Sequence, residues 1–227
     1  MEKIGLIILG LVLILALSIF LAARSVKTVS QQQTPEKKAA SESQLKTANQ
    51  DDHLLGNLYS PVQLIVYSDF ECPACESFSE TVCAAKTEFG DELTIVFRHF
   101  PLSMHENAML AANAAECASE QGFFWPMHDK IFEDNRGGVF TKEEFMKDAT
   151  ELNLEVERFS QCLTGEKYRE RILTDMGEGR LLGINGTPSV YLNGTELPGA
   201  IPFEDYQNGL GEDEKGLKSL IVEVLAE

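Results

Sequence analysis

Hydrophobic residues follow three different patterns along this chain. Residues 4–23, "IGLIILGLVLILALSIFLAA", contain no charged side chain over 20 positions, about the length that a helix needs to cross a bilayer. The next stretch, "SVKTVSQQQTPEKKAASESQLKTANQ", has almost no large apolar residues, so it cannot bury enough surface to fold. Strand and helix spacings begin soon afterwards. The patterns predict a transmembrane anchor over residues 1–24, a flexible linker over 25–52 and a domain over 53–227.

A cleaved signal peptide is the competing interpretation of the apolar segment. Its apolar region would normally run about 7 to 15 residues and end in an A-x-A-like site, whereas this segment is longer and ends in "FLAAR". An uncleaved anchor therefore fits better. Lys3 lies on one side of this segment, and Arg24 and Lys27 lie on the other. The positive-inside rule alone would weakly favour a cytoplasmic domain.

The domain opens with alternating strand and helix patterns. Residues 62–70, "VQLIVYSDF", form a β-branched run, which is typical of a strand. In the following "CESFSETVCAAKTEFG", apolar residues recur at the spacing of one helical face until Gly90. Residues 93–100, "LTIVFRHF", again favour a strand, which Pro101 ends. The core is therefore predicted to begin as strand, helix and strand.

Residues 105–182 are predicted to be helical throughout. Thr141 and Glu144 fit a capping box at the start of the third helix. The five helical segments are "HENAMLAANAAECASEQ", "FFWPMHDKIFED", "TKEEFMKDATEL", "LEVERFSQCL" and "EKYRERILTDMGEGRLLG".

Strand patterns return after the helical block. Residues 189–194, "SVYLNG", precede a short "TELPGA" across Asn193-Gly194, a strong hairpin dipeptide. The last stretch, residues 203–227, favours a loop-interrupted helix. A helical block between two β-containing halves is an insertion and not a second domain in series, so the fold class is α/β.

Charge is distributed unevenly along the chain. The formal net charge is −17; residues 1–50 carry six Lys or Arg against three Asp or Glu, and residues 51–227 carry 13 against 33. An acidic domain repels phosphate backbones, so nucleic acid is not expected as a partner.

Cys72 and Cys75 lie where the first strand turns into the first helix. A thiol at the first helical turn faces unsatisfied N–H groups and the positive end of the helix dipole, and its pKa can fall from about 8.5 to roughly 3.5 to 7.5. Cys72 occupies that place, and Pro73 suits the first turn because it lacks an N–H. Asp69 and Glu71 flank the turn and would raise the thiol pKa unless they point to solvent.

An isolated CxxC is compatible with a redox pair, half of a zinc site or a structural disulfide. A structural zinc site needs four ligands, but no second CxxC exists and His99, His105 and His128 are isolated in the sequence. Further along, Pro188 in "GINGTPSVYLNG" immediately precedes the returning strand. It is either a stop signal or part of a cis Thr187-Pro188 bond that turns the Thr187 backbone toward the cysteines and a bound peptide.

Five segments together resemble the DsbA-like thiol-disulfide oxidoreductases, which are thioredoxin-fold proteins with a helical insertion. The segments are "YSDFECPAC", "VFRHFPL", "AAECASEQGFFWPMHDKIF", "RLLGINGTPSVYLNG" and "GAIPFEDY", in the family's order over roughly residues 55–210. The resemblance implies a thioredoxin-like fold with an all-helical subdomain inserted at about 103–180, preceded here by the single N-terminal transmembrane helix.

The resemblance also implies roles for individual residues. The catalytic set would be Cys72 as the nucleophile, Cys75 as the resolving thiol, and Thr187 with the cis proline Pro188. The active-site turn would contain Glu71, Pro73 and Ala74. No cofactor and no metal are implied. The sequence departs from the family at Val66, where thioredoxin and several relatives carry a buried acid, so proton transfer to or from Cys75 must use water or another group.

The expected function is the introduction of disulfides into secreted or envelope proteins. The resemblance implies reduced or unfolded protein substrates, a membrane reoxidase of the DsbB-like or VKOR-like kind, and a catalytic domain on the extracytoplasmic side of the cytoplasmic membrane. Asn185 and Asn193 head N-G-T sequons, and a glycan near Pro188 would block the site, which favours a bacterial envelope. A reductase or isomerase, and a redox-inactive holdase or adaptor in which Cys72–Cys75 is a staple, are the alternatives.

The remaining cysteines are assigned structural or inert roles. Some members of the family have cysteines at the places of Cys117 and Cys162, which implies a structural disulfide; two buried free thiols are the alternative. Such a bond would favour an oxidising compartment. Cys83 is expected to be a part-buried, inert thiol. Phe123, Phe124 and Trp125 are expected to form core, and His99 to be packed and hydrogen-bonded.

Overall fold

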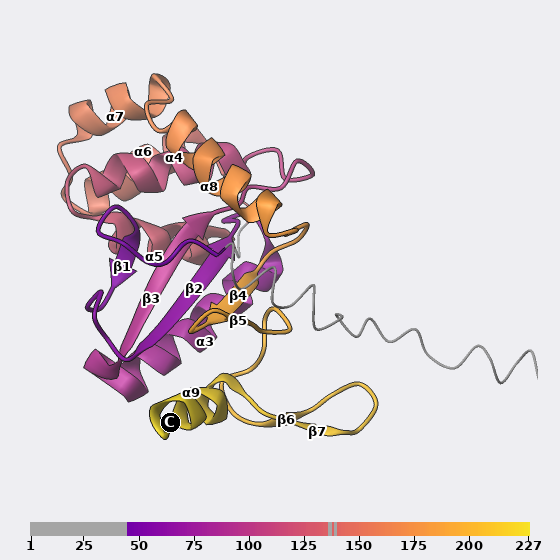
Figure 1. Cartoon of the computed structure of the whole chain (residues 1–227). Helices are drawn as coiled ribbons and strands as arrows, with labels where there is room; N and C mark the ends of the chain where they lie inside the picture. Colours follow the sequence, from indigo (N-terminus) through magenta and orange to yellow (C-terminus); the bar gives the residue numbers. More distant parts are fainter. Residues whose placement is uncertain (1–44, 136–137, 139) are drawn as a thin grey trace, which may run out of the picture. The chain divides into compact units, whose positions relative to one another are not determined.

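The computed structural model describes residues 45–135, 138 and 140–227 (Figure 1). The predicted transmembrane helix, residues 1–24, and most of the predicted linker lie outside the described residues. Among the helices that are described, none is long and apolar enough to cross a membrane.

A five-stranded sheet, in the order β1-β3-β2-β4-β5, forms the centre of the described part. The strands are β1 (His53–Leu55), β2 (Val62–Ser68), β3 (Leu93–His99), β4 (Ser189–Leu192) and β5 (Thr195–Glu196). β2 and β3 are parallel, with a register from Val62 opposite Leu93 to Ser68 opposite His99, and the other pairs are antiparallel. The strands predicted at 62–70, 93–100 and 189–194 are therefore confirmed.

Both faces of the sheet are covered by helices. On one face, Val62, Leu64 and Val66 of β2 pack with α3 (Pro73–Phe89) and α9 (Leu217–Leu225). On the other face, Ile65 and Tyr67 pack with residues of the inserted helices. Burial on both sides explains why β2 is an almost continuous apolar run rather than an alternating one.

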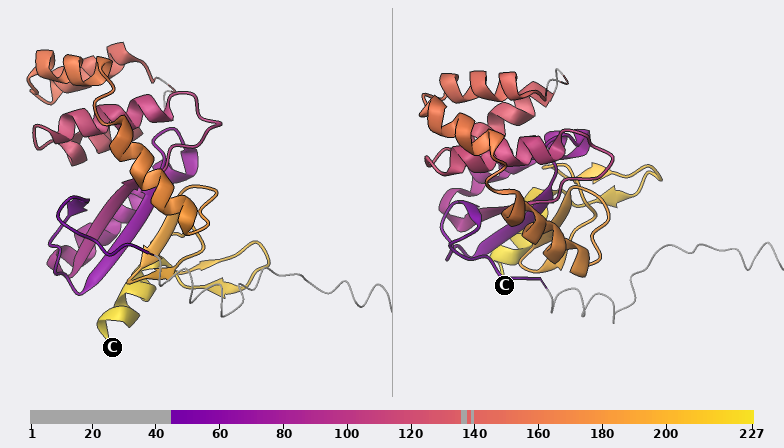
Figure 2. Two further views of the ribbon diagram at one scale, coloured as in Figure 1. Left: turned by 45° about the horizontal axis from the view of Figure 1, so that its top comes forward. Right: turned by 90° about the horizontal axis from the view of Figure 1, so that it is seen from above.

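Five helices follow β3 in the chain (Figures 1 and 2). They are α4 (Ala108–Ser119), α5 (Phe124–Asn135), α6 (Lys142–Glu151), α7 (Val156–Thr164) and α8 (Arg169–Leu181). α8 packs against Tyr67 on one face of the sheet, whereas α5 reaches the opposite face, where it lines a cavity with Val66 and α3. Thr141 caps α6, since its hydroxyl accepts a hydrogen bond from the Glu144 N–H at 3.2 Å, as the capping-box pattern predicts. Phe124 is buried, and Phe123 and Trp125 pack against the same core, which confirms that the aromatic cluster belongs to the interior.

Gly179 sets the close approach of α8 to the sheet. A Cβ built on it would lie 2.8 Å from two ring carbons of Phe100 and 3.2 Å from the Tyr67 ring. Only a residue without a side chain fits between this helix and the two aromatic rings.

Two parts of the fold differ from the sequence prediction. β1 is not predicted, because three residues are too few to show a strand period. The prediction of a loop-interrupted helix over 203–227 is wrong in its first half, where β6 (Tyr206–Gln207) and β7 (Asp213–Glu214) pair before α9 begins. The Asn208 side chain accepts hydrogen bonds from the Leu210 and Glu212 N–H groups at 2.9 and 3.1 Å, and this closes the turn between the two strands.

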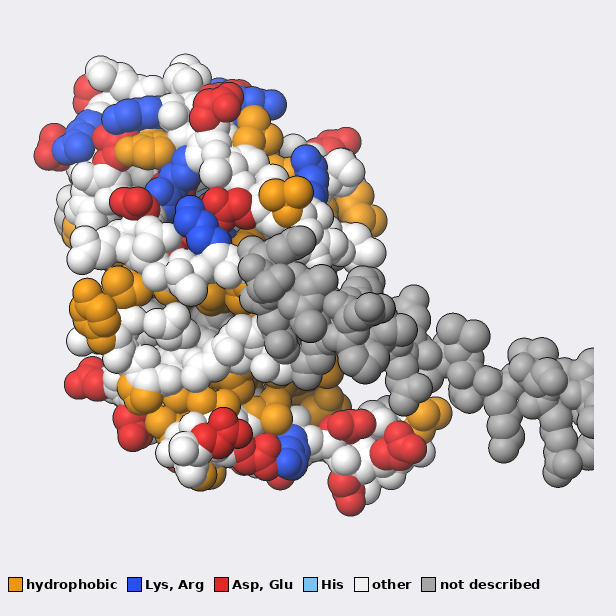
Figure 3. Space-filling model, viewed as in Figure 1, with side chains coloured by type: hydrophobic (Ala, Val, Ile, Leu, Met, Phe, Trp, Pro, Cys, Tyr) orange, Lys and Arg blue, Asp and Glu red, His pale blue; other side chains and the backbone are white. Residues whose placement is uncertain are grey.

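Acidic side chains gather over the C-terminal part of the domain in the view of Figure 3. They belong to the region of β6, β7 and α9, where Glu204, Asp205 and residues 212–214 are exposed. This placement agrees with the acidic composition of residues 51–227.

Candidate active site

Cys72 and Cys75 lie at the beginning of α3, directly after β2. Cys72 is the N-cap residue with an extended backbone (φ −84°, ψ 119°), and Pro73 is the first helical residue. The Cys72 carbonyl accepts hydrogen bonds from the N–H groups of Cys75 and Glu76 at 3.0 and 3.1 Å. Both cysteines are thiols, and they are 7% and 2% exposed. This places Cys72 at the helix terminus and Cys75 one turn deeper.

The Cys72 thiol is strongly acidified. Its pKa falls to about 5, chiefly because the Cys75 thiol donates a hydrogen bond to the Cys72 thiolate; burial opposes the shift, and hydrogen bonds with Thr187 and with the N–H groups of Cys75 and Ala74 add to it. The two backbone N–H groups are the unsatisfied donors that a helix N-terminus offers to an anion. At neutral pH Cys72 is therefore a thiolate.

Cys75 behaves in the opposite way. Burial raises the pKa of its thiol, and the hydrogen bond to Cys72 raises it further. The Asp69 N–H donates to the Cys75 sulfur at 3.5 Å. The site therefore combines an ionised outer sulfur with a protonated inner one, as thiol-disulfide exchange through a leading and a resolving cysteine requires.

Thr187 and Pro188 lie beside Cys72. Strand β4 pairs with β2, with Ser189 opposite Tyr67, so the residues just before β4 lie next to the turn that follows β2. The Thr187–Pro188 peptide bond is cis, and the Cys72 thiol lies within hydrogen-bond reach of the Thr187 carbonyl oxygen at 3.4 Å. The structure thus brings together Cys72, Cys75, Thr187 and Pro188 from two distant parts of the sequence.

The sequence leaves open whether Asp69 and Glu71 point to solvent, where they would not affect the pKa of the Cys72 thiol. In the structure they do not both point to solvent. Asp69 is 1% exposed, and its carboxylate accepts hydrogen bonds from the N–H groups of Glu71 and Leu102 and from Nδ1 of His105 at 2.7 to 2.8 Å. Glu71 accepts from the Asn107 N–H at 2.7 Å. Both acids therefore fasten the cysteine turn to the segment between β3 and α4, a role for which the sequence gives no signal.

His53, His99 and Glu116 form a separate cluster. Their ligand atoms lie within 4.8 Å of one another, and among the described residues this is the group that could hold a metal ion. Glu116 Oε1 accepts hydrogen bonds from both imidazoles at 2.8 and 3.0 Å and from Arg171 Nε at 2.6 Å. Burial alone would raise the pKa of Glu116, but the hydrogen bonds from His53 and His99 lower it. The cluster contains neither active-site cysteine, and Arg171 already supplies its positive charge, so it is a buried ion-pair network. Within it His99 is packed and hydrogen-bonded, as expected.

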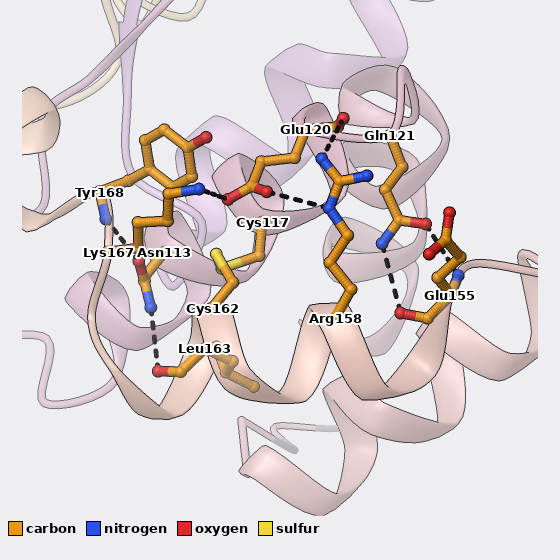
Figure 4. Close-up of a disulfide and its surroundings, with 10 residues drawn as sticks. All are labelled: Asn113, Cys117, Glu120, Gln121, Glu155, Arg158, Cys162, Leu163, Lys167 and Tyr168. Carbon is orange, nitrogen blue, oxygen red and sulfur yellow. Dashed lines mark hydrogen bonds and ion pairs between the residues drawn. A yellow bond between two sulfur atoms is a disulfide. The ribbon is translucent and has the colours of Figure 1, made fainter.

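The other cysteines have distinct environments. Cys117 and Cys162 form a disulfide that joins α4 to α7, with their Cα atoms 5.7 Å apart (Figure 4). The prediction that Cys83 is part-buried is wrong, because its thiol is exposed. The inward face of α3 carries Phe78, Val82 and Ala85, and the next residue after Val82 is turned about 100° away from that face.

Comparisons with known proteins agree with this geometry. A family model described as thioredoxin matches residues 48–211. The oxidised form of BdbD from Bacillus subtilis aligns over 80% of this chain and 97% of its own, with a TM-score of 0.67 and 19% identity. The thiol-disulfide exchange protein α-DsbA2 from Wolbachia pipientis aligns over 86% of this chain and 99% of its own, with a TM-score of 0.67 and 15% identity. At these identities the two structures establish the fold.

Curated relatives that match this chain in sequence include Na(+)/H(+) antiporters. The Na(+)/H(+) antiporter NhaA 1 of Salinispora arenicola is 34% identical over 154 residues, which are 67% of this chain and 23% of the antiporter. The antiporter NhaA of Herminiimonas arsenicoxydans is 34% identical over 149 residues, again 23% of its length. The chain therefore spans about a quarter of the length of these relatives.

Proposed function

This chain belongs to the thioredoxin family and has the fold of DsbA-like thiol-disulfide oxidoreductases, as its sequence resemblance predicts; on that premise we propose that it oxidises cysteine pairs in other proteins. The observation that carries the proposal is the contrast between an acidified Cys72 and a buried, protonated Cys75. A pair whose reduced form is stabilised in this way gives up its disulfide readily.

The reaction begins with the Cys72–Cys75 disulfide. A substrate thiolate attacks the Cys72 sulfur, the bond between the two cysteines breaks, and Cys75 leaves and takes up a proton. A second substrate thiolate then attacks the substrate sulfur of the mixed disulfide, and Cys72 leaves as a thiolate. The substrate pair is oxidised to a disulfide, and Cys72 and Cys75 are reduced to the two free cysteines that the structure describes.

The acidity of Cys72 favours electron flow from the substrate to the Cys72–Cys75 pair. A thiol with a pKa of about 5 is about 99% ionised at pH 7, whereas an ordinary cysteine is ionised only to a few per cent. At pH 7 this stabilises the reduced pair about 100-fold, which raises the reduction potential by about 60 mV at 29.6 mV per tenfold change. An oxidase benefits from this shift, and a reductase would lose by it.

The same proposal includes a substrate, a reoxidising partner and a cellular location. The Thr187 backbone, which lies beside Cys72, would pair with an extended substrate peptide. We assign the domain to the extracytoplasmic side of a bacterial cytoplasmic membrane, held by the predicted anchor over residues 1–24. The Cys117–Cys162 disulfide supports an oxidising compartment. After each turnover a membrane reoxidase of the DsbB-like or VKOR-like kind would restore the Cys72–Cys75 disulfide.

The test is the oxidation of a reduced, unfolded protein that regains activity only when its native disulfides form. The oxidised full-length chain should restore that activity, Cys72→Ser should abolish the effect, and Cys83→Ala should leave it unchanged because Cys83 is an exposed cysteine that the chemistry does not use. Activity retained in Cys72→Ser would contradict the proposal and favour a holdase. Rapid reduction of insulin disulfides with no oxidation of the substrate would instead indicate a reductase.

A further inference from the structure

The proposed reaction requires a proton to move at Cys75. When Cys75 leaves the disulfide it must be protonated, and when it attacks a mixed disulfide it must lose that proton. Cys75 is 2% exposed, and burial raises the pKa of its thiol, so an uncatalysed transfer to bulk water is slow. Val66, six residues before Cys72, has no ionisable group and cannot assist.

A small cavity lies directly against Cys75. Its volume is about 20 Å³, enough for one water molecule. Its walls come from β2, α3, β3 and α5, and they are mostly apolar side chains, Val66 among them. The histidine on this wall is His128 of α5, which reaches the cavity from the inserted helices.

The surroundings of His128 orient its ring. Its Nδ1 lies 2.8 Å from Oδ1 of Asp129, whose carboxylate can only accept, so Nδ1 carries the proton and Nε2 keeps a free lone pair. The rings of Phe132 and Trp125 pack against the imidazole, with centroids 4.8 and 4.9 Å from its own, and these contacts hold its orientation. Asp129 is 79% exposed, and therefore connects the buried imidazole to solvent.

The charge state of His128 suits a proton acceptor. Burial lowers the pKa of its imidazole more than the hydrogen bond to Asp129 raises it, so the ring is neutral at pH 7. Among the described residues, the titrating groups that act on its pKa are Asp129 on its own helix and His99 on β3, and the Cys75 thiol of α3 lines the same cavity.

We propose that His128 is the proton acceptor for Cys75, across the cavity that both side chains line. In the mixed disulfide, the Cys75 S–H proton passes to Nε2 of His128, directly or through one water molecule. The Cys75 thiolate attacks the Cys72 sulfur, the bond from Cys72 to the substrate breaks, and the substrate leaves as a thiolate. The two cysteines are oxidised to the disulfide, the substrate sulfur is reduced, and the imidazolium returns its proton to solvent. In the opposite direction a proton from solvent reaches the leaving Cys75 thiolate along the same path through Nε2 of His128.

This inference rests on the proposed redox role of the cysteine pair, and one assay separates the two. The reduced full-length chain carrying Cys83→Ala is mixed with Ellman's reagent in a stopped-flow instrument. Attack by Cys72 releases a first coloured thiolate, and attack by Cys75 on the resulting mixed disulfide releases a second. The first phase reports Cys72 alone, and the second phase reports deprotonation and attack by Cys75.

His128→Gln should slow the second phase at least tenfold at pH 7, since positioned bases contribute about 100-fold or more, and should leave the first phase within about twofold. The deficit should shrink as the pH rises, because hydroxide then replaces the lost base. Asp129→Asn, at an exposed position that does not threaten folding, should slow only the second phase, by a few-fold.

A second substitution, Val66→Asp, tests whether another proton acceptor on the cavity can replace His128. In the His128→Gln background it places a carboxyl group on the same cavity and should restore much of the second phase, whereas the near-isosteric Val66→Asn should not. Equal slowing of both phases, a deficit independent of pH, or a second phase unchanged in both His128→Gln and Asp129→Asn would overturn the assignment to His128. Absence of the second phase in the Cys83→Ala parent would instead overturn the redox pair itself.

Discussion

Removing the Cys117–Cys162 disulfide should destabilise the domain by the entropy of one large loop. The two cysteines are 45 positions apart, and the chain-entropy relation for a loop of this length gives about 4 kcal/mol at 25 °C. Both residues are buried, so replacement of each by Ala leaves small apolar side chains in the same place and exposes no new polar group.

Other contacts around the disulfide survive the substitution. Glu120, the C-cap residue of α4, forms ion pairs with Arg158 and Lys167 at 3.3 and 2.7 Å. The Asn113 side chain donates to the Leu163 carbonyl at 3.1 Å (Figure 4). The native packing of α4 on α7 therefore persists, and the loss of stability should come from the unfolded state.

The assay is urea unfolding followed by the fluorescence of Trp125, the single tryptophan of the chain. Cys117→Ala/Cys162→Ala is compared with the parent, with Cys83→Ala in both. We expect the free energy of unfolding to fall by about 3 to 5 kcal/mol with an unchanged fold. A loss below about 1 kcal/mol would refute the reasoning, because the 45-position loop would then carry no entropy for the bond to remove.

Three further predictions concern packing, pH and thiol exposure. Gly179→Ala should cost about 1 to 3 kcal/mol of unfolding free energy by urea titration, because the new methyl group would meet Phe100; no loss would contradict the close approach. Burial lowers the pKa values of His53 and His128, so the unfolded chain binds more protons than the folded chain below about pH 6.5. The free energy of unfolding should therefore be larger at pH 7.5 than at pH 5.5, by up to about 1.4 kcal/mol per pH unit for each histidine. An unfolding free energy that does not change with pH would count against the burial of the two histidines. Cys83 should be alkylated by a maleimide in the native, oxidised protein as fast as a free thiol, and protection would show that it is covered.

The sequence predicts those parts of the fold that depend on strong local periods. β2, β3 and the inward face of α3 follow directly from their apolar spacings, and the same spacing, applied strictly, also places Cys83 outside. β1 escapes prediction because it is only three residues long, and its position is fixed by pairing with β3 and by a hydrogen bond from Trp125 to the Leu54 carbonyl at 2.9 Å.

The site is predictable only as far as chemistry follows chain position. The leading place of Cys72 at a helix N-terminus is visible in the sequence. The burial of Asp69 is not, because its partners Leu102 and His105 lie more than 30 residues away. His128 is a further case: nothing local distinguishes it from other core histidines, and only tertiary packing places it on the same cavity as Cys75.

The most direct test of the central claim is the reduction potential of the Cys72–Cys75 pair, measured by equilibrating the Cys83→Ala protein with glutathione at pH 7. Stabilisation of the Cys72 thiolate predicts a value above about −180 mV, the oxidising end of a secretory glutathione poise. A value far below about −250 mV would make the pair a reductant, and it would contradict the proposal that this protein donates disulfides.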